Sequence, residues 1–241
     1  MLATRQQVKD RLGFASADTE HDAVIDRLLV NVSDLLAREA GRVAGGVACL
    51  EKATVTEVFS PELRDKVLWL TARPVISVTS IKEALYGAYA DATALTAASD
   101  YWLNNAFGRL TRIGWWLAGD ETVQAVYVGG YVLALAWVSG TSYVAGDCVT
   151  SGGAIYECIL AVSGSTAPAS DETHWTLRTT YTALPGEINE AAIQQAQFFF
   201  TRRTSIGQSA TGVQGASLTM YQQDDLLPDV KRIMARYRRI A

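Results

Sequence analysis

Residues 123–158 read VQAVYVGGYVLALAWVSGTSYVAGDCVTSGGAIYEC, and this stretch decides how the chain is divided. Its first part has the alternating pattern of a strand, whereas from Trp137 onward it is rich in Gly, Ser, Thr and aromatic residues. Residues 184–203, LPGEINEAAIQQAQFFFTRR, then return to helical spacing. Without the unusual stretch, the strand would lead through a short loop into that helix. The sequence therefore predicts an inserted domain at 137–179 within an outer domain formed by 1–136 and 180–241.

The predicted insert has the pattern of a small all-β module. Two strands would meet at the turn SGG, residues 151–153, which favours a tight hairpin. Four side chains can then point to one face of the hairpin: Tyr143, Val149, Tyr156 and Cys158.

The outer domain begins with two predicted helices. Thr4 and Gln7 have the spacing of a capping box, which predicts a short first helix. A long helix follows, with Asp18 or Thr19 as its candidate cap and Gly41 just past its end. Its apolar residues recur at three- and four-residue steps: Ile25, Leu28, Leu29, Val32, Leu35 and Leu36.

From Thr54 onward the pattern of the outer domain changes to a period of two. Strands are predicted at 54–60, 65–70, 74–81, 100–105, 108–113 and 122–132. Two further helices are predicted, at 187–203 and from Pro228 onward. The predicted fold class is α+β, with helices packed on a small, mainly antiparallel β-sheet or barrel and with an inserted small all-β module.

Composition and motifs argue against an enzyme. The 241 residues are 49% hydrophobic and carry a net charge of −4, which does not favour general binding to nucleic acid. The glycine-rich segments lack the phosphate-loop and dinucleotide patterns. His21 and His174 have no nucleophile in a recognisable motif, and the three cysteines lack metal-ligand spacing. We therefore expect no catalytic residues, no metal and no cofactor.

The expected compartment is a cytoplasm, at least until assembly. The sequence has no apolar run of about 18 residues and no signal-peptide pattern at its start. Cys148 and Cys158 could face each other across a hairpin, but a cytoplasmic origin favours free thiols.

The insert resembles the small chitin-binding-type carbohydrate-binding modules. The resemblance lies in W-x-S-G-T-S-Y-x-x-G-D-x-V from Trp137, followed by G-x-x-Y-x-C and P-x-x-D-x-x-H-W. It implies that Trp137, Tyr143, Tyr156 and Trp175 occupy the positions that stack on sugar rings in that family. A module of this size also needs aromatic residues for its core, and a contact with another protein is a third possibility.

The outer domain resembles the head–tail connector, or adaptor, proteins of tailed bacteriophages. The resemblance lies in ordered segments that include LATRQQVKDRLGF, LTARPVISVTSI, DYWLNNAFGRLTRI and LLPDVKRIMARYRR. It implies a structural virion protein at the head–tail interface, with twelve copies in a ring that joins the capsid portal to the tail. The implied partners are other copies, the portal protein and a downstream stopper or tail-completion protein, while DNA passes through the channel without sequence-specific binding. The alternative is a carbohydrate-binding accessory protein that acts through the insert.

Two groups of residues are candidate assembly sites. Phe198, Phe199 and Phe200 cover most of the circumference of their helix, so either they close the ring or the core of the subunit buries all three. The basic residues of the last helix are candidates for portal docking or form a solvated face: Lys231, Arg232, Arg236, Arg238 and Arg239. Residues 204–225 are expected to order on the same contact. Deletion of residues 226–241 is expected to leave a folded subunit that does not bind portal.

Overall fold

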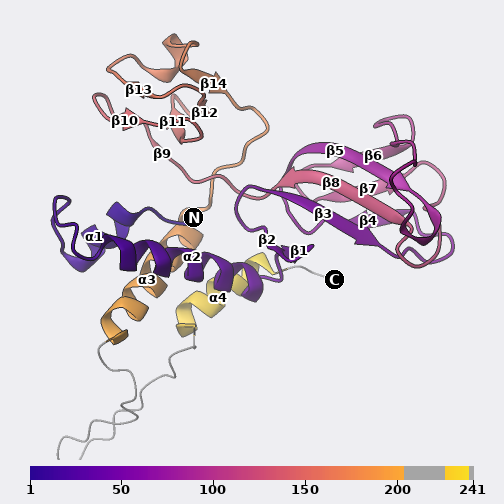
Figure 1. Ribbon diagram of the computed structural model, residues 1–241, viewed down its shortest axis with the longest axis horizontal. Helices are drawn as coiled ribbons and strands as arrows, with labels where there is room; N and C mark the ends of the chain where they lie inside the picture. Colours follow the sequence, from indigo (N-terminus) through magenta and orange to yellow (C-terminus); the bar gives the residue numbers. More distant parts are fainter. Residues whose placement is uncertain (204–225, 239–241) are drawn as a thin grey trace, which may run out of the picture. The chain divides into compact units, whose positions relative to one another are not determined.

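The computed structural model describes residues 1–203 and 226–238 (Figure 1). Contacts among these residues define two compact units. The helical unit combines Met1–Ala40 with Pro185–Ala241, and the β unit comprises Gly41–Leu184. Helices and mainly antiparallel strands thus segregate along the chain, and the predicted α+β class is confirmed. None of the described helices is both long and apolar enough to cross a membrane.

The described part of the helical unit consists of α1 (Arg5–Leu12), α2 (Asp22–Glu39), α3 (Gly186–Arg202) and α4 (Pro228–Tyr237). α3 contacts the other three helices, so the segment that follows the β unit completes a bundle begun by the first forty residues. The bundle is held by buried apolar residues, which include Ile25, Leu29, Val32, Leu36, Ile188, Ala192, Ala196, Val230 and Met234.

The start of α1 confirms one predicted cap, whereas the start of α2 corrects the other. Thr4 Oγ1 accepts a hydrogen bond from the N–H of Gln7 at 3.2 Å, and Gln7 Oε1 accepts one from the N–H of Thr4 at 2.8 Å. α2 begins after His21 without a side-chain cap, so the predicted caps Asp18 and Thr19 are wrong. The carboxylate of Asp18 instead accepts from the N–H of Glu20 within the preceding loop.

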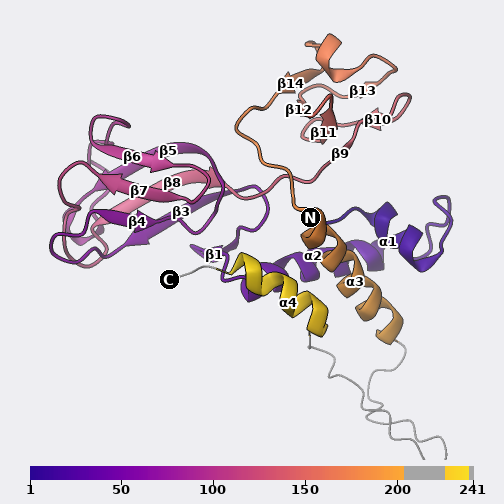
Figure 2. The ribbon, with the colours of Figure 1, turned by 180° about the vertical axis from the view of Figure 1, so that it is seen from behind.

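The first part of the β unit is a sandwich of two three-stranded antiparallel sheets (Figure 2). One sheet has the order β3 (Ala53–Phe59), β8 (Val123–Gly129), β5 (Val75–Glu83). The other has the order β4 (Val67–Trp69), β7 (Arg109–Arg112), β6 (Tyr101–Asn104). A hairpin of β1 (Val43–Ala44) and β2 (Val47–Ala48) precedes them, and the short helix η1 (Leu85–Gly87) follows β5. All six predicted strands are found, but among the described residues they do not close into a barrel.

Both sheets contribute to one buried core, and a carboxylate is enclosed within it. Glu57 Oε2 accepts hydrogen bonds from the Tyr127 hydroxyl at 2.8 Å and from the N–H of Thr71 at 3.0 Å. The Tyr127 hydroxyl accepts from the N–H of Ala72 at 2.9 Å, and burial raises its pKa far above the usual value. A buried polar group is tolerated when its hydrogen bonds are satisfied, so this network ties β3, β8 and the β4–β5 connection together.

Gly129 and Gly130 stand where β8 leaves the sandwich. A Cβ atom on Gly129 would lie 2.2 Å from the carbonyl oxygen of Ala72, and one on Gly130 would lie 2.2 Å from that of Glu51. Gly130 also has a φ of 104°, which disfavours residues with a side chain. The close approach of three backbone segments therefore requires glycine at both positions.

The second part of the β unit contains the residues of the predicted insert and the strand directly before them. β9 (Ala134–Ala136), β11 (Cys148–Ser151), β12 (Ala154–Cys158) and β14 (Trp175–Leu177) form one sheet in the order β14-β12-β11-β9. β10 (Ser142–Tyr143) pairs with β13 (Val162–Ser163), and the short helix η2 (Pro168–Ser170) precedes β14.

The predicted hairpin is confirmed, because Ser151 pairs with Ala154 around Gly152 and Gly153, which have φ values of 59° and 82°. The domain boundary at 137–179 stays a prediction.

Candidate assembly surfaces

Three of the five candidates for portal docking lie on the exposed side of α4, and a fourth, Arg238, directly follows the helix. Lys231, Arg232, Arg236 and Arg238 are exposed, and Arg239 lies outside the described residues, as does the predicted contact segment 204–225. The arginines are paired with carboxylates of the same subunit: Arg232 with Asp229 at 3.2 Å, Arg236 with Glu187 at 2.7 Å and Arg238 with Glu39 at 3.8 Å. Exposed ion pairs of this kind contribute little to stability, so carboxylates of a partner could replace the intrasubunit ones at a low cost in free energy.

The opposite side of α4 belongs to the core of the helical unit. Val230 and Met234 have no exposed surface, and Gln195 Oε1 on α3 accepts a hydrogen bond from the N–H of Leu227 at 3.0 Å. Deletion of 226–241 would expose this core, so the burial argues against the expectation that the truncated subunit stays folded.

The three phenylalanines of α3 have different environments. Phe200 is 7% exposed, and its ring packs edge-on to Phe14 and His21 at centroid distances of 5.6 Å and 5.4 Å. Phe198 and Phe199 are half-buried and contact each other with centroids 5.9 Å apart. The ring-interface role stays a prediction, and Phe198 and Phe199 are the members with surface left to contribute to it.

The four aromatic candidates of the insert gather around one small core. Trp175 is 3% exposed and lies in this core with Val149 and Cys158, and Trp137, Tyr143 and Tyr156 pack against it. Tyr143 meets the indole of Trp175 edge-on at a centroid distance of 5.1 Å. Stacking on a sugar needs an open ring face, so this arrangement favours the core interpretation, while glycan contact stays a prediction. The large apolar side chains that the insert exposes are aliphatic: Val138, Val144, Ile159, Leu160 and Leu177.

A charged cluster joins the outer face of the insert's sheet to the start of the sandwich. The carboxylate of Glu157 on β12 accepts from Lys52 Nζ at 2.9 Å, from Arg178 Nε at 2.7 Å and from the Tyr181 hydroxyl at 3.0 Å. Lys52, which directly precedes β3, also lies 4.8 Å from the centroid of the Tyr181 ring. We call Lys52, Glu157, Arg178 and Tyr181 the clamp, because they connect segments 105 residues apart in the chain.

The clamp shifts the titration of its members. Burial alone would raise the pKa of Glu157, but hydrogen bonds from Lys52 and Tyr181 outweigh it, so the pKa of this carboxyl lies below its usual value. Burial alone would lower the pKa of Lys52, and its bonds to Tyr181 and Glu157 raise the pKa above the usual value instead. Both shifts stabilise the charged forms, as expected for an ion pair whose partners are held in place.

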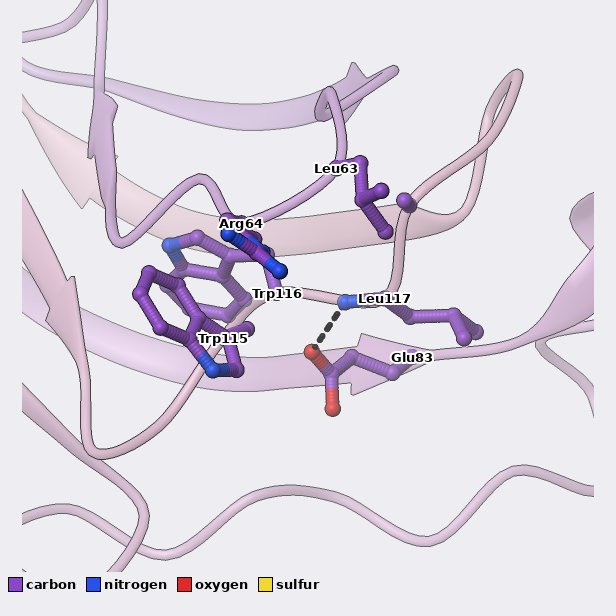
Figure 3. A pocket seen from close by; sticks show the side chains of 7 residues that line it. Leu63, Arg64, Glu83, Trp115, Trp116 and Leu117 are labelled. Atoms are coloured by element: carbon purple, nitrogen blue, oxygen red, sulfur yellow. Dashed lines mark hydrogen bonds between the residues drawn. The ribbon is translucent and has the colours of Figure 1, made fainter.

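A pocket of about 430 Å³ opens at the end of the sandwich where β3 and β5 finish (Figure 3). Its walls include Leu63, Arg64, Trp115 and Trp116, with the two indoles together on one side. Glu83 Oε1 accepts from the N–H of Leu117 at 3.0 Å, and Glu83 Oε2 lies 3.1 Å from Arg112 Nη2. Glu83 is therefore neutralised within the subunit, and the other lining residues are apolar except for the exposed Arg64.

The sequence reasoning did not single out the residues around this pocket. The sequence feature that could have indicated the pocket is the pair Trp115–Trp116 in a loop. Trp116 is buried in the core at 2% exposure, whereas Trp115 is 55% exposed. Lys66 Nζ lies 4.5 Å from the centroid of the Trp115 ring, and Trp116 Nε1 donates to the carbonyl of Lys66 at 3.0 Å.

The three cysteines form no disulfide in the described part of the chain. Burial raises the pKa of the Cys148 thiol to about 11. A thiol with that pKa stays protonated and is a poor nucleophile at neutral pH. No cluster of three or more potential metal ligands occurs in the described part of the chain.

Comparison with known proteins identifies a fold relative. Neither a protein-family model nor a curated protein matches the chain. Among solved structures, the chain is similar to one described as "Neck of empty GTA particle computed with C6 symmetry", with a TM-score of 0.52 and 14% sequence identity. The similarity covers 99% of this chain and 91% of the other, so it extends through both units. At this identity the similarity shows a shared fold.

Proposed function

We propose that this chain is a structural protein of the neck that joins the head to the tail in a tailed phage or a phage-like particle. The fold relative comes from a particle neck, and the similarity spans nearly the full length of both chains. The order of sequence segments independently resembles that of head–tail connector proteins. This full-length agreement is the observation that carries the proposal. The role is assembly, not catalysis, and the protein would be located in the virion after assembly in the host cytoplasm.

Copies of the chain form a ring, of twelve subunits by the connector resemblance, that extends the DNA channel. A closed ring requires a heterologous interface, in which one surface of a subunit fits a different surface of its neighbour. Phe198 and Phe199 are candidates for part of that interface, because they remain half-buried beside the core residue Phe200. The net charge of −4 suits a channel that lets DNA slide, because it provides no excess of phosphate-binding cations.

The portal protein is the proposed partner of α4. The exposed cations of this helix, which include Lys231 and Arg232, lie on the face away from the buried Val230 and Met234. An acidic surface on the portal would replace the intrasubunit carboxylates that now pair with the arginines. A stopper or tail-completion protein is the proposed partner on the tail side.

For the inserted module we propose a protein contact in preference to sugar binding. Its aromatic side chains pack in or against its own core, whereas its exposed large apolar side chains are aliphatic. Aliphatic side chains can be buried against another protein but offer no ring face for a sugar. A glycan array with the full chain tests this choice, and specific binding to chitin or a cell-wall glycan would reverse it.

Reconstitution with the portal protein from the same genome tests the main proposal. We expect the mixture to form rings on the portal that are visible by electron microscopy, and charge reversal at Lys231 and Arg232 to weaken their formation. Val47→Lys, at an exposed position of the β unit, is the control and should leave ring formation unchanged. Absence of any complex between the wild-type chain and portal would refute the proposal.

A further inference from the structure

The sandwich carries two groups of large apolar side chains that are exposed by about half or more. On the sheet β4-β7-β6, Leu68, Leu110 and Tyr101 point into the core. Their neighbours along the strands alternate outward, so Trp102 and Arg109 lie on the outer face, and Trp102 is 58% exposed. Phe107, in the turn between β6 and β7, is 62% exposed. We call Trp102, Phe107 and Arg109 the tryptophan face.

The second exposed group lies at one end of the sandwich. β3, β5 and β7 end there and β4, β6 and β8 begin there, as the pairs Phe59–Val123 and Tyr101–Arg112 show. The connecting loops at this end, which also form the pocket of Figure 3, carry exposed large apolar residues: Leu63, Leu85, Tyr86, Ile113 and Trp115. We call these five residues the loop end. Tyr86 is 95% exposed and Leu63 is 82% exposed.

These two groups together are large enough to form an interface. With about 200 Å² for a large side chain, their exposed fractions correspond to roughly 900 Å² of surface. A specific protein–protein interface buries about 1,200–2,000 Å² in total, counting both partners and the polar rim. Soluble monomers rarely expose contiguous apolar patches larger than a few hundred Å². The two groups would therefore supply most of the apolar centre of one standard interface if they met.

Charge also favours their contact. Arg109 is exposed on the tryptophan face and makes no ion pair within the described part of the chain. Four exposed carboxylates, Glu62, Asp91, Asp120 and Glu121, belong to the loops of the loop end, against the exposed cations Arg64 and Lys66. A cation on one surface and a net acidic rim on the other are complementary across a contact between two copies.

We infer that the tryptophan face of one copy contacts the loop end of the next copy. The contact joins two different surfaces, which is the heterologous arrangement that a ring needs, and a solved fold relative comes from a neck with cyclic symmetry. The inference rests on the proposed function, since it names the surfaces through which the ring subunits meet. It adds a contact in the β unit to the one proposed for α3 in the helical unit.

Complementation between two defective variants tests this inference. Trp102→Glu places a carboxylate on the tryptophan face and leaves the loop end intact, whereas Tyr86→Glu does the reverse. Each variant alone should associate at least about 30-fold more weakly than the wild type, the usual effect of losing one interface hot spot. Mixed together, they should form heterodimers and stop, because only one productive junction remains. Val58→Glu, at a 41% exposed position on the other sheet, is the control and should assemble like the wild type.

Native mass spectrometry at high protein concentration, with and without portal, distinguishes the outcomes. Heterodimers from the mixture would support the contact between the two surfaces. Monomers only from the mixture, or normal rings from either variant, would overturn the contact, whereas the neck function would stand as long as the wild type forms rings. A variant that loses only its complex with portal, and not its self-association, would assign the surface to portal and also overturn the contact. A wild type that neither self-associates nor binds portal would overturn both proposals. Circular dichroism of each variant checks that it is folded.

Discussion

Replacement of Glu157 with glutamine should loosen the attachment of the inserted module to the sandwich. The carboxylate accepts from Lys52, Arg178 and Tyr181 at 2.7–3.0 Å, and its side chain is 12% exposed. Glutamine has nearly the same shape but no charge, and its amide nitrogen would face at least one donor. A hydrogen bond to a charged group contributes about 1.5–3 kcal/mol. Loss of one such contribution corresponds to a roughly ten- to hundred-fold larger population of the opened clamp.

Native-state hydrogen exchange measures this population directly. Amides of β12 and β14 are expected to exchange about ten- to hundred-fold faster in Glu157→Gln, whereas amides of β3 and β8 in the sandwich are expected to keep their rates. Glu172→Gln is the matched control, because Glu172 is an exposed carboxylate of the same module for which the described residues provide no hydrogen bond. Equal exchange in Glu157→Gln and the wild type would refute the view that the clamp holds the module.

Three further predictions follow from the packing and from the same clamp. Because the pKa of Glu157 is lowered in the folded protein, its contribution to stability is complete above the unfolded pKa of about 4.3 and is lost as pH falls through the lower folded pKa. Hydrogen exchange of the β12 amides should therefore rise below about pH 4 in the wild type and not in Glu157→Gln. Gly129→Ala should lower the free energy of urea unfolding by about 1–3 kcal/mol, because the new Cβ would lie 2.2 Å from the carbonyl oxygen of Ala72. Gly164→Ala is the control and should lower it by under about 0.5 kcal/mol, because its Cβ would meet Val162 at 3.5 Å. Similar losses in the two variants would contradict the packing argument. Met234→Ala should destabilise the helical unit by about 2–5 kcal/mol in thermal unfolding and Lys231→Ala by less than about 0.5 kcal/mol, and the reverse order would show that α4 is not packed as described.

The elements of the fold could be predicted well because their signals are local. The capping box at Thr4 and the turn at Gly152 act within a few residues, and both occur as predicted. The start of α2 could not be predicted from its caps, because the loop before it is organised by Lys9. This lysine is 3% exposed and donates to Asp22 at 2.9 Å and to the carbonyl of Ser16 at 3.0 Å, which are tertiary contacts without a sequence period.

The candidate sites could be predicted only in part, because residue type does not fix burial. Positions 198, 199 and 200 all hold phenylalanine, yet only Phe200 is buried in the core of the helical unit. The clamp was not predicted, since Lys52 and Glu157 are far apart in the chain and belong to no motif. The exposed Trp102 and Trp115 have ordinary strand and loop contexts, so their exposure became visible only when their sheets and loops were placed.

The two connections of the module run beside each other, and this has a consequence for how the chain could be altered. Val132 accepts from the N–H of Leu184 at 2.8 Å and donates to the carbonyl of Thr182 at 2.9 Å, so the outgoing and returning backbones are bonded before the module begins. A gene segment that encodes a different domain with neighbouring ends could be exchanged at this place without lengthening either connection. The same junction is therefore a natural position for a fluorescent reporter, and one through which related particles could acquire or discard decorations during evolution.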